Sequence, residues 1–98
     1  MDKEQAETEV ENTIRNWREQ ARAHWREFRP TLYRDLKRSG KLEQALTGAA
    51  ERTQSEMKKL EGMGFYAHEA WEIIRESYLF PPEEGKPWAY SDSPFWKP

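Results

Sequence analysis

The chain has 98 residues, of which 36% are hydrophobic and 35% are charged, so it suffices for one small domain only. It contains no cysteine, which excludes disulfides, thiolate nucleophiles and thiolate metal ligands. No apolar run is long enough for a signal peptide or a membrane span. We therefore expect a cytoplasmic protein without a membrane segment.

The formal net charge of −2 conceals an uneven distribution of charge along the chain. Residues 15–41 hold nine Arg and Lys against three Asp and Glu, whereas residues 1–12 and 42–98 both carry an excess of acidic side chains. A basic middle segment between acidic ends favours an acidic partner or self-complementary packing.

A long first helix is predicted to organise the domain. One face of residues 10–29 carries a seam at steps of three and four residues, made of Val10, Ile14, Trp17, Ala21, His24 and Phe28. The helix could begin at Asp2 or at Thr8, because each offers a cap. Pro30 ends or kinks it, since proline disfavours helical geometry at the preceding residue.

A short second helix is expected over residues 30–39, because proline suits a first helical position and Gly40 a helix end. A third helix is predicted over residues 41–61. Its small residues Ala45, Ala49 and Ala50 are expected to receive the large side chains of the first helix, namely Trp17, Trp25 and Phe28.

A fourth helix is predicted over residues 67–78, and Pro81 and Pro82 prevent its continuation. The predicted fold class is all-α, a small helical bundle of three longer helices and one short helix over residues 1–80. Residues 81–98 are expected to form an extended, proline-rich tail. Its aromatic residues are Trp88, Tyr90, Phe95 and Trp96.

The segment RPTLYRDLKRSGKLEQAL, residues 29–46, resembles the RP-x-LY-x₂-L-x₂-SGKL core of the small transposon-encoded TnpV family. The wider pattern, up to EAWEIIRESYLFPPEE, is similar to a set of small helical proteins of bacteria and their phages or mobile elements. This resemblance implies a phage or mobile-element setting. It implies no catalytic residue and no mechanism.

Several chemistries lack the residues they need. The two histidines, His24 and His68, fall on different predicted helices, and no metal-ligand spacing surrounds them. We interpret His24 as a helix-packing histidine with a satisfied ring nitrogen. Ser39-Gly40-Lys41 lacks the rest of a phosphate-binding loop, and no Gly-x-Ser-x-Gly occurs. We expect no catalytic residue, no cofactor and no metal.

A row of basic residues is the first candidate binding site. It comprises Arg15, Arg18, Arg22, Arg26, Arg29, Arg34, Lys37, Arg38 and Lys41. The row could be a solvated helix face with local ion pairs, a surface for an acidic protein, or a track for a phosphate backbone.

The aromatic tail is the second candidate binding site. It could be a strap across its own helices, or it could dock into a partner or a second copy and so form a dimer. We predict a non-enzymatic protein-binding module that occupies a surface of a larger protein or complex. The alternatives are a nucleic-acid-binding accessory protein that uses the basic 15–41 surface, and a self-assembling helical oligomer.

Overall fold

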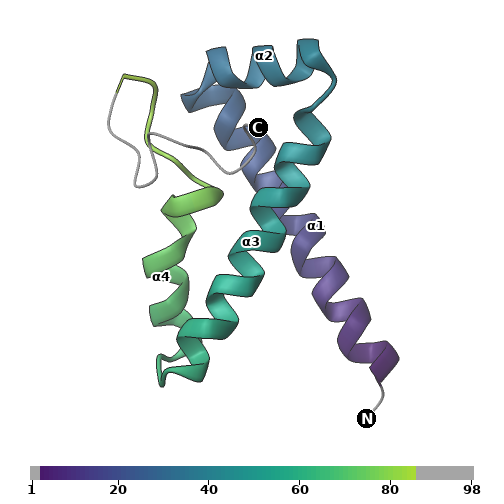
Figure 1. Ribbon diagram of the computed structural model, residues 1–98, viewed down its shortest axis with the longest axis vertical. Helices are drawn as coiled ribbons and strands as arrows, with labels where there is room; N and C mark the ends of the chain where they lie inside the picture. Colours follow the sequence, from purple (N-terminus) through teal and green to yellow (C-terminus); the bar gives the residue numbers. More distant parts are fainter. Residues whose placement is uncertain (1–2, 86–98) are drawn as a thin grey trace.

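The computed structural model describes residues 3–85, with side chains from residue 9 onwards. Within this range the chain forms four helices and no strand (Figure 1). They are α1 (Lys3–Phe28), α2 (Pro30–Ser39), α3 (Leu42–Gly62) and α4 (Ala67–Tyr78). The predicted all-α bundle of three longer helices and one short one is confirmed. Residues 86–98 of the predicted 81–98 tail, including its four named aromatic residues, lie outside the described residues.

The helix boundaries follow from a few residues with restricted or unusual backbone conformations. Because Pro30 excludes helical geometry before it, Arg29 takes φ −130° and ψ 58° and separates α1 from α2. Gly40 has φ 76°, and the amide of Lys41 bonds the carbonyl of Leu36 at 2.9 Å, which closes α2 with a Schellman motif. The predicted bounds of α2 and α4 are confirmed, and α3 lies one residue later than predicted.

Of the two predicted starts of the first helix, Asp2 and Thr8, the structure excludes Thr8. The backbone is already helical at Lys3, so Thr8 lies inside α1 and does not begin it. In Figure 1 the N-terminal end of α1 extends beyond the other three helices. α3 crosses α1, α4 runs along the second half of α3, and α2 lies across the end where α1 stops and α3 starts.

The core sits where α1, α3 and α4 meet. α1 contributes the fully buried Ala21 and Trp25, and α3 contributes the largest share of buried residues. The buried residues of α3 are Leu42, Ala45, Leu46, Ala49, Ala50 and Thr53. Trp25 belongs to the same core cluster as the three alanines, as the sequence predicted. Trp17 is half-buried against this cluster, but its ring stacks on Trp71 of α4.

Phe28 does not fill the alanine surface of α3 and is 38% exposed, so this part of the packing prediction is wrong. The buried residues of α1 are Ala21 and Trp25. At about 100° of turn per residue, the direction midway between them is displaced around the helix from the centre of the predicted seam. Because the buried face of α1 is displaced in this way from the predicted one, the row of basic residues on α1 lies close to α3. It leaves Trp17, His24 and Phe28 on the side of α1 that faces α4 and the segment after it.

Candidate binding surfaces

The nine predicted basic residues fall into two groups in the structure. Arg18, Arg22 and Arg29 are half-buried and have partners within the protein. The other six side chains are exposed, namely Arg15, Arg26, Arg34, Lys37, Arg38 and Lys41. Among residues 9–85, none of these six has a carboxylate within ion-pair distance. The continuous row seen in the sequence is therefore divided between internal contacts and free surface.

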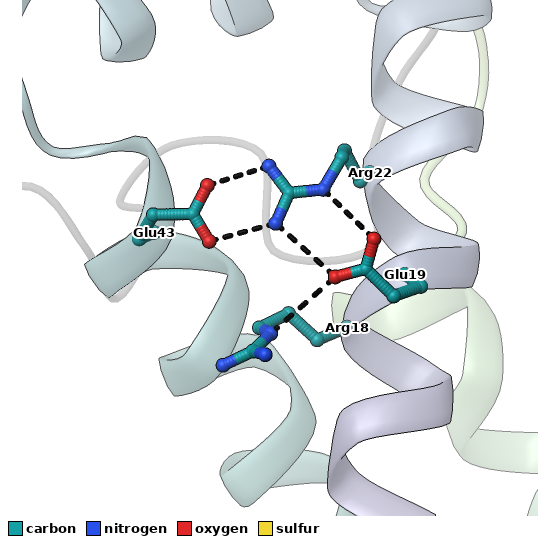
Figure 2. Close-up of polar contacts among 4 residues, drawn as sticks. All are labelled: Arg18, Glu19, Arg22 and Glu43. Carbon is teal, nitrogen blue, oxygen red and sulfur yellow. Dashed lines mark hydrogen bonds and ion pairs between the residues drawn. The ribbon is translucent and has the colours of Figure 1, made fainter.

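Arg22 joins α1 to the first turn of α3 (Figure 2). Its Nη1 and Nη2 donate to the two carboxylate oxygens of Glu43 at 2.5 and 2.7 Å. Its Nε and Nη2 donate to the two oxygens of Glu19 at 3.1 and 3.2 Å. Arg18 Nε lies 3.6 Å from a Glu19 oxygen. We name these four residues the Arg22 cluster.

The Arg22 cluster shifts the ionisation of its members. Hydrogen bonds to Glu43 and Glu19 raise the pKa of Arg22. The hydrogen bond from Arg22 is the largest effect on both carboxylates and lowers the pKa of each. Glu19 lies one helical turn before Arg22, so the sequence predicted that pair, whereas Glu43 lies 21 residues away and was missed.

Four of the six exposed cations of the row lie on α2 or just after it. Leu36 is the buried residue of α2, and Arg34 and Arg38 each stand two residues from it, about 200° around the helix. Both therefore point away from the core. Lys37 lies nearer to the core, with Nζ 6.0 Å from the centre of the Tyr33 ring.

The segment after α4 packs against the end of α1, and we call residues 79–85 the C-terminal strap. The indole Nε1 of the fully buried Trp25 donates to the carbonyl of Leu79 at 2.9 Å. His24 Nε2 lies 2.6 Å from the carbonyl oxygen of Pro81, so the ring donates there. The predicted packing role of His24 is confirmed. Residues 81–85, the described start of the predicted tail, lie against the protein's own helices, while the choice between strap and docking segment for the aromatic residues stays open.

The strap continues onto the junction between α1 and α2. Arg29 Nη1 donates to the carbonyls of Pro82 and Glu83 at 3.0 and 3.3 Å. The amide of Glu84 donates to the carbonyl of Phe28 at 2.8 Å. Successive carbonyls of the strap are thus held by side chains of α1 and by Arg29, the residue that follows it.

The carboxylate of Glu84 binds the start of α2. Its Oε1 accepts hydrogen bonds from the amides of Thr31 at 2.5 Å and Leu32 at 3.1 Å. Burial acts to raise the pKa of Glu84, but the hydrogen bonds from Leu32 and Thr31 and the charge of Arg29 lower it overall. This contact joins residues more than fifty positions apart, so no local pattern in the sequence predicts it.

A row of aromatic rings fills the space between α1 and α4. Trp17 stacks on Trp71 with ring centres 5.3 Å apart, and Trp71 meets Phe80 edge-on at 6.0 Å. Phe80 then contacts His24 at 5.3 Å, and His24 contacts Phe28 at 4.6 Å. These rings occupy the other side of α1 from the Arg22 cluster, which explains the seam read from the sequence.

Among residues 9–85, whose side chains the structure describes, no group of three or more His, Cys, Asp or Glu side chains is arranged to hold a metal ion. Over residues 3–85, every helix is too short or too polar to cross a bilayer.

Comparison of the chain with models of protein families, with curated proteins and with solved structures finds no match. The candidate surfaces must therefore be judged on the chemistry of their own residues.

Proposed function

We propose that this chain is a non-enzymatic protein-binding module that occupies an acidic surface of a larger protein through α2. One observation carries the proposal: Arg34 and Arg38 are exposed, point away from the core and have no ion-pair partner among the described residues. Lys37 and Lys41 add two further exposed cations at the same end of the domain. Clustered like charges on a rigid helix attract a complementary surface and orient the encounter.

A phage or mobile-element setting is part of the proposal. It rests on the resemblance of residues 29–46 to the TnpV core, and this segment contains the whole of α2. In such a setting a small module of this kind would act by covering a surface of a host or element protein. Whether covering it blocks or recruits depends on the partner.

Nucleic-acid binding through residues 15–41 is the alternative. Arg18, Arg22 and Arg29 are engaged within the protein, so fewer cations face outward than the sequence suggested. The sequence pI of about 5.7 also disfavours a long polyanion, because the rest of the surface would repel it.

Charge reversal on α2 tests the proposal against the alternative. Poly-L-glutamate serves as the probe for an acidic polypeptide, and a short DNA duplex serves as the probe for nucleic acid. The variant Arg34→Glu/Arg38→Glu should bind poly-L-glutamate about tenfold more weakly than the unaltered chain, because two outward charges change sign. The matched control Lys58→Glu/Arg75→Glu makes the same change in net charge on exposed positions of α3 and α4.

The control variant should lose less than about threefold in affinity, because its charges lie away from α2. Equal loss in both variants would mean that net charge alone is sensed, and the proposal would fail. Tighter binding of the duplex, with an affinity that falls steeply with salt, would instead establish the nucleic-acid alternative. Light scattering at two protein concentrations separates either result from self-assembly.

A further inference from the structure

The N-terminus of α2 obtains its cap from the far end of the described chain. A helix leaves the first few backbone N–H groups without partners inside the helix. In α2, Pro30 has no N–H, and the amide of Tyr33 bonds the carbonyl of Arg29 at 2.9 Å. The two amides that remain, those of Thr31 and Leu32, both donate to Glu84 Oε1.

No nearer residue supplies this cap. The N-cap position is Arg29, which makes no side-chain capping bond to α2. Its guanidinium instead donates to the carbonyls of Pro82 and Glu83, immediately before Glu84. Arg29 therefore holds the strap, and the strap in turn caps the helix that follows Arg29.

Besides this cap, α2 is held by the buried Leu36, by the partly buried Leu32 and Tyr33 against the core, and by the turn at Gly40. It has ten residues, below the roughly 12 to 15 at which isolated helices become marginally stable in water. Leu36 is its one buried residue. A carboxylate at the N-terminus satisfies two amides and interacts favourably with the helix dipole, so its removal should matter more here than in a well-buried helix.

We propose that the C-terminal strap is a latch that holds α2 in its helical form, with the Glu84 carboxylate as the contact that joins them. The end of the strap, residues 82–85, and α2 then open as one unit, while Leu79, Pro81 and the core of α1, α3 and α4 stay folded. This proposal rests on the proposed function for its biological meaning, because α2 carries the cations assigned to binding. Release of the strap would then remove the ordered binding surface.

Native-state hydrogen exchange measured by NMR tests the latch without any partner. In Glu84→Ala, the protection of the Leu36 and Lys37 amides, which lie inside α2, should fall by about fivefold or more, the usual scale for loss of an N-cap. The Thr31 and Leu32 amides should exchange faster as well, because they lose their acceptor. The α3 amides of Leu46 and Ala49 should change much less, because they report the core. Glu76→Ala is the matched control, since it removes an exposed carboxylate from α4.

The conservative variant Glu84→Gln separates the cap from the charge. It keeps a carbonyl oxygen that can accept from both amides, so it should retain most of the protection that alanine loses. Unchanged Leu36 and Lys37 protection in Glu84→Ala would overturn the latch, because loss of protection at Thr31 and Leu32 alone means only that two hydrogen bonds are missing. An equal fall in the protection of α2 and α3 amides would mean global unfolding and would also overturn it. The same holds if Glu84→Ala and Glu84→Gln lose protection equally.

Hydrogen exchange in the presence of poly-L-glutamate distinguishes failure of the latch from failure of the proposed function. If poly-L-glutamate binds α2, linkage requires that it also raise the protection of the Glu84 amide, which donates to Phe28. Reduced protection in Glu84→Ala without any response to poly-L-glutamate would keep the latch and overturn the proposed function. Binding of poly-L-glutamate with unchanged α2 protection in Glu84→Ala would keep the proposed function and overturn the latch.

Discussion

The two sides of α1 are held by polar contacts of different kinds. On the α3 side, Arg22 binds carboxylates on side chains that are 54% and 63% exposed, Glu19 and Glu43. On the strap side, Trp25 and Arg29 donate to backbone carbonyls, one of them belonging to the fully buried Leu79.

The difference lies in what each partner can do when the contact is lost. An exposed carboxylate regains water, so its ion pair adds little net stability. A buried carbonyl or indole N–H cannot regain water, and leaving it without a partner costs its desolvation. The contact of Trp25 with Leu79 thus has more weight in the fold than the ion pairs of Arg22. Arg29 lies between the two, because one of its partner carbonyls is part-buried and the other exposed.

Substitution of Trp25 should have the largest effect of the changes considered. Trp25→Ala removes a fully buried ring from the core and should lower the free energy of unfolding by about 3–5 kcal/mol. Trp25→Phe keeps most of the ring but leaves the Leu79 carbonyl without its donor, and should cost about 1–3 kcal/mol. Denaturant unfolding measures both. A Trp25→Phe variant as stable as the parent would show that the strap contact adds nothing.

A pair of arginine variants tests the contrast itself. Arg29→Met keeps the apolar stem but removes the donor to two strap carbonyls, and should cost about 1–2 kcal/mol. Arg22→Met removes exposed ion pairs and should cost about 0.5–1 kcal/mol, less in high salt. The exposed Arg26→Met is the control and should stay within about 0.5 kcal/mol of the parent. A larger loss of stability in Arg22→Met than in Arg29→Met would contradict the difference drawn between the two sides of α1.

Acid should produce the smallest of these effects. The hydrogen bond from Arg22 is the main cause that lowers the pKa values of Glu19 and Glu43. For Glu84, burial acts to raise the pKa, but the hydrogen bonds from the start of α2 lower it overall. Each group binds fewer protons in the folded state. Its contribution is therefore complete above the ordinary value of 4.5 and is lost as the pH falls through the lowered folded value.

Thermal unfolding between about pH 5 and pH 3 measures this loss. The parent should lose stability more steeply over that range than Arg22→Met, because the variant has already lost the contacts that lower two of the three pKa values. Parallel curves for the two proteins would mean that the Arg22 cluster contributes nothing to the acid dependence.

Much of the fold could be predicted because its signals are local. Pro30 and Gly40 set the limits of α2 within a few residues, and helical periodicity identified α3 and α4. The exact buried face of α1 could not be predicted in this way. Apolar and basic residues lie on adjacent faces, and the position of α3 decides which of them is covered.

The candidate site was less predictable, because its deciding contacts are distant in sequence. Glu43 neutralises Arg22 from 21 residues away, and Glu84 reaches Thr31 from 53 residues away. Periodicity on one helix carries no information about either partner. The sequence therefore identified the basic residues but not which of them remain exposed.

Hydrogen exchange in two single variants, followed residue by residue, tests the central claim most directly. Glu84→Ala should lower the protection of Thr31 and Leu32, whereas Arg22→Met should leave both amides unchanged relative to the core. Together with a fall in protection of Leu36 and Lys37 in Glu84→Ala only, this result would show that the strap, and not the Arg22 cluster, controls α2. The same pattern of exchange in both variants would contradict the account.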